Sequence, residues 1–179
     1  MTGGCACGKV RFEATVEPEE AYLCHCRMQK DLVMSYYYKS DYEKALAGVK
    51  TMLDRDDADV VTFQIAGNVY KALEEVKECD KVYKKGLKKF PNSGPLYSEY
   101  GELLWAKKDF SAIEQWEKGI QVDPAYSGNY YNAARFYFYT KDKVWSLVYG
   151  EIFVNMIILT AGYKLLISSM KFTPKPSGK

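Results

Sequence analysis

Apolar, small and aromatic residues recur along this chain at a spacing of 33 to 34 residues, from about Met28 to about Phe153. When Phe63–Tyr70 is laid over Tyr97–Leu104, the aromatic residue, the glycine and a large apolar residue fall in register. Each unit contains two amphipathic stretches of helical period, joined by a short polar turn. Self-similarity at this period predicts stacked pairs of antiparallel helices rather than the core of a globular enzyme.

Glycines inside the predicted helices indicate where two helices approach each other closely. Gly67 and Gly101 each cost about 1 kcal/mol relative to alanine in a helix interior, so a packing requirement is expected at both positions. Pro91 and Pro124 mark the ends of the second helices, because proline cannot continue a helix that precedes it.

The repeat resembles the tetratricopeptide repeat. In the second unit the positions that define that family hold Phe63, Ala66, Gly67, Tyr70, Cys79, Tyr83, Gly86 and Pro91. The resemblance implies an all-α solenoid of helical hairpins, wound as a right-handed superhelix. Four repeats are predicted, at about 28–59, 60–93, 94–126 and 127–158, followed by a closing helix over 159–171 and a flexible tail over 172–179.

The same resemblance implies a binding surface. First helices of successive tetratricopeptide repeats line a concave groove that holds extended or helical peptide segments. The groove positions of this chain are Lys30, Tyr37, Gln64, Asn68, Lys71, Glu102, Trp105, Tyr131, Arg135 and Phe138. Trp105 and Tyr131 are the expected anchors, because large aromatic side chains dominate protein-binding surfaces. The leading interpretation is a non-catalytic scaffold that binds a protein or peptide partner.

Residues 1–27 do not follow the repeat and are predicted to form an irregular or β-hairpin segment. They contain Gly3-Gly4-Cys5-Ala6-Cys7-Gly8-Lys9-Val10-Arg11-Phe12 and Cys24-His25-Cys26. This segment resembles the start of the glutathione-dependent formaldehyde-activating enzymes, which are zinc proteins with a β-rich fold. The resemblance implies structural zinc ligands at Cys5 and Cys7 and catalytic-site ligands at Cys24 and Cys26. The family's next cysteine is replaced by Gln29, and its later C-x-x-C pair is missing.

Three readings of these four cysteines stay open. Four thiolates can form a tetrahedral zinc site, so zinc is the one cofactor that the sequence suggests. The second reading is reduced, inert thiols, and the third is adventitious disulfide or dimer formation. His25 is the single histidine of the chain, which excludes Ser-His or Cys-His catalytic pairs elsewhere. The alternative function is therefore a zinc-binding module or a degenerate carbon-sulfur lyase of the formaldehyde-activating type, with no catalytic residue assigned.

Charge and hydropathy limit the remaining partners. A net charge of +2 gives no large field that would attract nucleic acid. Residues 152–170 carry a single charge, Lys164, over nineteen positions, which reaches the lower limit for a membrane span. Packing against the last hairpin is the preferred interpretation, self-association is an alternative, and a membrane span is disfavoured. No signal peptide is visible at the start of the chain, so a cytoplasmic location is expected.

Overall fold

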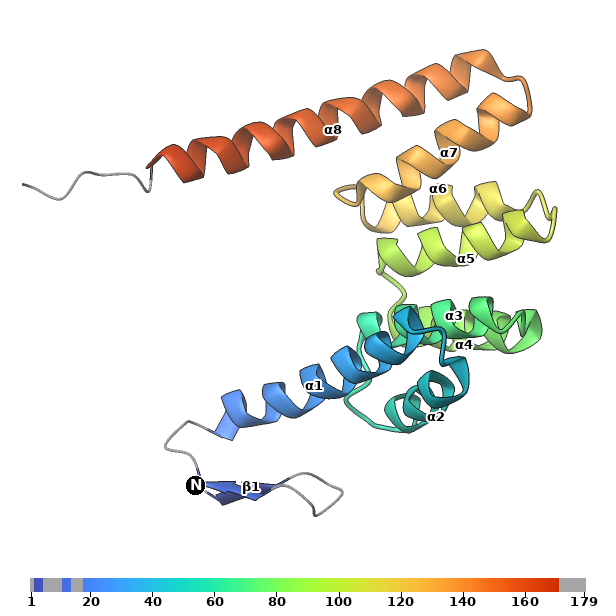
Figure 1. Cartoon of the computed structure of the whole chain (residues 1–179). Coiled ribbons are helices and arrows are strands. Elements are labelled where there is room, and N and C mark those ends of the chain that lie inside the picture. Colours follow the sequence, from blue (N-terminus) through green and yellow to red (C-terminus); the bar gives the residue numbers. More distant parts are fainter. Residues whose placement is uncertain (1, 5–10, 14–17, 171–179) are drawn as a thin grey trace, which may run out of the picture. The chain divides into compact units, whose positions relative to one another are not determined.

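The computed structural model describes the backbone of residues 2–4, 11–13 and 18–170, and the side chains of residues 28–160. Two short strands precede eight helices in this part of the chain (Figure 1). The elements are β1 (Thr2–Gly4), β2 (Arg11–Glu13), α1 (Pro18–Tyr38), α2 (Tyr42–Leu53), α3 (Val60–Ala72), α4 (Val76–Lys89), α5 (Gly94–Ala106), α6 (Ala112–Val122), α7 (Ser127–Tyr139) and α8 (Lys143–Met170). The predicted series of helical hairpins is confirmed.

The chain divides into two compact units, Met1–Gly86 and Leu87–Lys179, called here the amino-terminal and carboxy-terminal units. In the amino-terminal unit β1 pairs with β2 in an antiparallel register that sets Gly3 opposite Phe12. Helix α1 then packs against α2 and α3. In the carboxy-terminal unit α7 packs against α5, α6 and α8.

Helix α1 begins ten residues before the first repeat was expected to start at Met28. Pro18 stands at its first position, where proline is favourable because the first helical N–H needs no partner within the helix. Glu19 and Glu20 follow in the first turn and complement the helix dipole. Residues 18–27 therefore extend the first repeat, and Cys24 and Cys26 lie within the helical span.

One residue in each intra-hairpin turn adopts a left-handed backbone conformation. These residues are Ser40, Glu74, Lys108 and Lys141, with φ between 58° and 68°. After α1, α3 and α5 the chain also closes with the same backbone hydrogen bond, as in Asp109 N–H to Leu104 O at 2.9 Å. This bond satisfies a carbonyl that the helix end leaves unpaired. The repeat thus reappears in the backbone geometry of the turns.

Close helix approach at glycine is the main packing feature of the second and third hairpins. Gly67 of α3 lies against the ring of Tyr83 from α4, and Gly101 of α5 lies against the indole of Trp116 from α6. A methyl group on either glycine would overlap that ring. Tyr83 and Trp116 are almost completely buried, so each ring has little room to withdraw.

The fourth hairpin departs from this arrangement. Gly150 of α8 stands where Tyr83 and Trp116 stand in the earlier repeats, and it faces Ala134 of α7. A methyl group at Gly150 would meet only the Ala134 Cβ, at an ordinary contact distance of 4.0 Å. No large ring separates α7 from α8 at this level.

Helix α8 continues without a break from Lys143 to Met170. The separate closing helix expected over 159–171 is replaced by this continuation, which runs well past the end of α7 (Figure 1). The physical reason is that no proline occurs between Pro124 and Pro174, and Gly162 alone does not stop an otherwise apolar helix.

The glycine contacts predict opposite effects for the same substitution. Gly101→Ala should lower the free energy of unfolding by about 1–3 kcal/mol, because its methyl group overlaps Trp116. Gly150→Ala should raise it by up to about 1 kcal/mol, because helix propensity improves without a clash. Urea unfolding followed by circular dichroism measures both. A loss of stability at Gly150 equal to that at Gly101 would contradict this packing.

Candidate functional site

The five groove positions predicted in the amino-terminal unit lie on α1 and α3. Lys30 Nζ forms an ion pair with Asp59 Oδ2 at 2.6 Å. Asp59 also caps α3 by accepting from the backbone N–H of Thr62 at 2.9 Å. Partial burial opposes ionisation of Asp59, but the hydrogen bonds from Lys30 and Thr62 outweigh it, so the pKa of this carboxyl is lowered. Lys30 therefore ties α1 to the start of α3.

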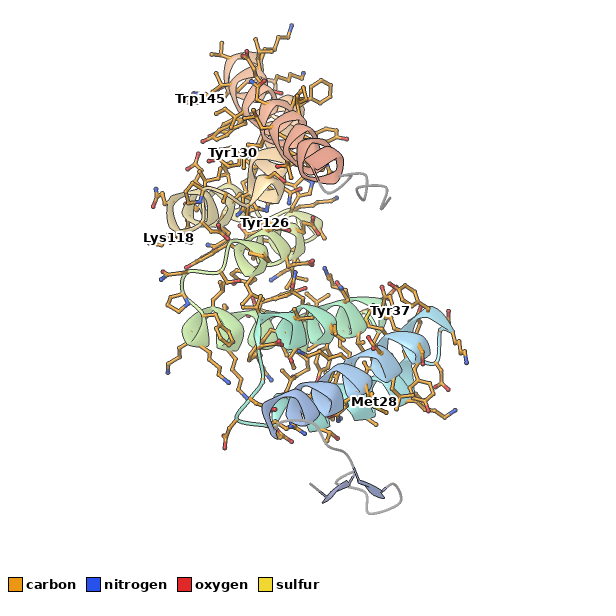
Figure 2. The ribbon with its side chains drawn as sticks, turned by 90° about the vertical axis from the view of Figure 1, so that its left-hand side faces the viewer. Met28, Tyr37, Lys118, Tyr126, Tyr130 and Trp145 are labelled. Carbon is orange, nitrogen blue, oxygen red and sulfur yellow. The ribbon has the colours of Figure 1, made fainter. Side chains whose placement is uncertain are left out.

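The other four positions form a mixed, half-buried surface. Tyr37 lies near the end of α1 (Figure 2). Its ring contacts those of Tyr38 and Tyr42, at centroid separations of 5.7 and 5.8 Å. Gln64, Asn68 and Lys71 follow one another at helical spacing along α3 and are each partly exposed. The Lys71 ammonium lies 5.7 Å from the centre of the Tyr83 ring. This lining offers amides and one cation to a ligand.

Trp105, an expected anchor, is the centre of an aromatic cluster in the carboxy-terminal unit. Its ring lies 5.3 Å from Phe136 and 6.4 Å from Trp116. Phe110 and Tyr139 complete the cluster at 6.1 Å each. Aromatic pairs at these separations add stability beyond the burial of their surface. Trp105 therefore joins α5, α6 and α7 while part of its side chain stays exposed.

An exposed face on α7 contains the three other aromatic and basic positions of the prediction. Tyr131 is 45% exposed and Phe138 is 70% exposed. Arg135 lies between them on the same helix face and stacks on Tyr131, with its guanidinium carbon 5.3 Å from the ring centre. Residues four and three positions apart share one side of a helix. We call Tyr131, Arg135 and Phe138 the α7 face.

Glu102, the remaining predicted position, is fixed by a polar network that the sequence did not reveal. Asn132 of α7 donates to Glu102 Oε1 at 3.3 Å and to Ser98 Oγ at 3.0 Å. Asn129, fully buried, donates to the carbonyl of Gly94 at 3.1 Å. These bonds join α7 to α5, because buried polar groups require partners. Two asparagines three residues apart carry no periodic signal that would have identified them.

A second polar cluster links α6, α7 and α8. Glu117 accepts from the hydroxyl of Tyr137 at 3.1 Å and from that of Tyr149 at 3.4 Å. The two tyrosine rings stack with centroids 5.8 Å apart and planes within 4°. Burial, reinforced by the Glu117 carboxylate, raises the pKa of Tyr137 to about 12. Trp145 packs on Tyr149 and completes this cluster at the start of α8 (Figure 2).

Next to the α7 face lies an open hollow of about 540 Å³. It is lined by Phe138 of α7 and by one side of α8, namely Lys143, Ser146, Leu147, Gly150, Glu151, Val154 and Asn155. Most large apolar side chains of α8 up to Leu159 are exposed, including Val144, Leu147, Val154 and Ile158. Exposed apolar surface of this extent usually marks a contact with another macromolecule or a membrane.

Among the described helices, α8 is the one whose length and composition would allow it to cross a membrane. The window Lys143–Thr160 has a mean hydropathy of 1.3, and none of it is buried within the protein. Length and composition alone are weak evidence for a membrane span, because core helices of soluble proteins meet the same criteria.

The cysteines predicted as metal ligands lie largely beyond what the structure describes. Cys5 and Cys7 fall outside the described residues, and of Cys24 and Cys26 only the helical backbone is described. Cys79 is buried and reduced, and its thiol donates to the carbonyl of Gly67 at 3.5 Å. Within the described side chains, no group of three or more histidine, cysteine or acidic residues is placed to hold a metal ion.

Solved structures with the same arrangement of helices include that of MamA, with a TM-score of 0.64 and 16% sequence identity over 80% of this chain and 85% of that one. A fragment of MamA from Desulfovibrio magneticus RS-1 gives a TM-score of 0.57 at 14% identity, over 76% of each chain. PcrH, solved with the chaperone binding region of PopB, gives 0.53 at 14% identity, over 69% of this chain and 97% of that one.

The fold is a tetratricopeptide-like helical repeat. At these identities the likeness establishes the fold alone, and it confirms the all-α repeat predicted from the 33 to 34 residue period. The sequence model of the glutathione-dependent formaldehyde-activating enzymes matches residues 1–47. That stretch contains β1, β2, α1 and the start of α2, so its second half belongs to the helical repeat. No curated protein sequence matches the chain.

The packing of Trp105 gives a testable prediction. Trp105→Ala should lower the free energy of unfolding by about 2–4 kcal/mol, because it opens a cavity among Phe110, Trp116 and Phe136. Phe138→Ala is the control, since this exposed ring should change stability by less than about 0.5 kcal/mol. Urea unfolding compares the two. Equal, small effects would show that Trp105 is available as a ligand anchor instead.

Proposed function

We propose that this protein is a non-catalytic scaffold that binds a peptide segment of another protein, and that the α7 face is the centre of its binding surface. The observation that carries the proposal is the exposure of Tyr131 and Phe138 on either side of Arg135. Tyrosine, arginine and other large side chains supply most of the energy in protein interfaces. The Tyr131 ring contacts Phe153 of α8, with centroids 5.1 Å apart, but it stays 45% exposed, and Phe138 is 70% exposed.

The surroundings of the α7 face suggest the chemistry of the ligand. Arg135 keeps its guanidinium at the surface over a tyrosine ring, which favours a carboxylate as its partner. Phe138 borders the hollow on α8 and favours an apolar side chain. Glu102 is held in place by Asn132 and would repel a second carboxylate nearby. The ligand is therefore an apolar peptide with one acidic group.

Two similarities support this function at the level of the fold. The structure of PcrH contains a segment of PopB, and that of Naa15 with Naa10 contains HypK. The second matches this chain with a TM-score of 0.57 at 17% identity, over 85% of this chain and 26% of that one. We propose that this protein also binds a protein partner. We do not propose that the partner is PopB or HypK.

A displayed library of random twelve-residue peptides, selected against the full chain, tests the proposal. Selected peptides should be apolar with an acidic residue, and Arg135→Ala should weaken their binding about tenfold or more, equal to about 1.4 kcal/mol. Tyr131→Ala should have a similar effect. Tyr38→Ala, which removes an exposed tyrosine ring from α1, should leave binding unchanged.

Two results would contradict the proposal. One is selection of peptides whose affinity is insensitive to Tyr131 and Arg135. The other is a loss of affinity that follows a loss of helix content in the variants, measured by circular dichroism.

A zinc-binding module in the amino-terminal segment is the second candidate, favoured by the match of residues 1–47 to the formaldehyde-activating family. The ligands would be Cys5, Cys7, Cys24 and Cys26. Protein purified without chelator should then contain about one zinc ion per chain, since one tetrahedral site uses four thiolates. Changing Cys24 and Cys26 to serine should remove the zinc, whereas Cys79→Ser should not. A metal-free wild-type protein would reject this candidate.

A further inference from the structure

The carboxy-terminal unit contains a seat for one more helix. Helix α7 lies against both helices of the preceding pair, α5 and α6. There Asn129 packs on Gly119 of α6 and donates to the carbonyl of Gly94 in α5. The next pair, α7 and α8, has an open hollow lined by Phe138 of α7 and by seven residues of α8 between 143 and 155. Gly150 keeps this hollow open, because it has no side chain to fill it.

The second half of α8 has no neighbour within the described part of this unit. Helix α8 has 28 residues, whereas α7 has 13. Among the side chains of α8 that the structure describes, which end at Thr160, the last partly covered ones are Phe153 and Met156. We call the fourteen residues from Ile157 to Met170 the overhang. Its first three side chains, Ile157, Ile158 and Leu159, are 47–74% exposed.

The length of the overhang argues against a membrane span. Fourteen helical residues extend about 21 Å, whereas the hydrocarbon core of a bilayer is about 30 Å thick. Lys164 stands in the middle of this stretch, and Lys171 follows it. The first half of α8 cannot supply the missing length, because α7 lies along it. An apolar helix of this length suits a contact with another helix.

We propose that two copies of this chain associate through α8, antiparallel and about a two-fold axis close to Ile157 and Ile158, so that the overhang of each copy lies in the hollow of the other. A two-fold interface presents the same surface on both copies, so one contact covers both hollows and both overhangs. An axis at this level also brings Glu151 of one copy level with Lys164 of the other. These two residues carry opposite charges.

Sedimentation velocity of the full chain, under reducing conditions, tests the association. The wild-type protein should show a monomer–dimer equilibrium that depends on concentration. Val154→Glu, which places a charge in the hollow, should weaken the dimer at least tenfold. Val148→Glu is the matched control, since Val148 lies on α8 outside the hollow and should leave the dimer intact.

Gly150→Trp tests the hollow itself. Its ring should fill the space from within the same chain and weaken the dimer, while circular dichroism shows unchanged helix content. A wild-type monomer at high concentration would overturn the proposal, as would equal effects of Val154→Glu and Val148→Glu. Binding of the wild-type protein to phosphatidylcholine vesicles that Val154→Glu abolishes would assign the surface to a membrane instead, and would also overturn it.

Cysteine cross-linking tests the orientation. In a chain with serine at positions 5, 7, 24 and 26, Ile158→Cys should form a disulfide-linked dimer, because this residue lies close to its own copy at the axis. Leu147→Cys should not form a disulfide-linked dimer, because the two copies of residue 147 lie far apart along the paired helices. The reverse pattern would exclude the antiparallel arrangement. Tyr131 and Arg135 lie outside the hollow, so their substitution should leave the dimer unchanged and a failure of peptide binding would not affect this proposal.

Discussion

The close contact between a glycine of the first helix and an aromatic ring of the second is the constraint on which the second and third hairpins depend. Gly67 with Tyr83, and Gly101 with Trp116, hold their helices at a separation that a methyl group would prevent. The Trp116 indole also donates to the carbonyl of Ser98 at 3.1 Å, and its ring reaches the next hairpin, with its centroid 6.2 Å from that of Phe136. The cost of glycine in a helix is offset by burial of a large ring.

The fourth hairpin replaces this contact with a different one. Ala134 and Gly150 face each other, and the helices are held by Glu117, Tyr137 and Tyr149 through hydrogen bonds and ring stacking. The cluster of Glu117, Tyr137 and Tyr149 lies on one side of α8. The hollow beside Gly150 lies on another side of the same helix. Loss of one ring from the repeat pattern therefore creates the surface on which the dimer proposal rests, beside the α7 face proposed for peptide binding.

Comparison of the predicted and observed sites separates two kinds of residue. Tyr131, Arg135 and Phe138 were predicted from their places in the repeat, and the structure leaves all three at the surface. Lys30 and Trp105 were predicted in the same way, but they take part in an ion pair with Asp59 and a ring cluster. The position of a residue in the repeat predicts which side of a helix it occupies. It does not predict which side chain it contacts, because that side chain can be distant in sequence: Asp59 is 29 positions from Lys30.

The sequence by itself determined the helical hairpins, their period and the glycine contacts, because these follow from local periodicity and from residue size at fixed spacing. The sequence did not determine two helix boundaries. Helix α1 begins at Pro18 and not at Met28, and α8 continues to Met170 and does not end at residue 158, because no proline lies within either helix after its first residue. The polar ties of Asn129, Asn132 and Glu117 were decided by tertiary structure alone. These hydrogen bonds join helices that come into contact only when the hairpins stack. Contacts between hairpins produce no periodic pattern in the sequence.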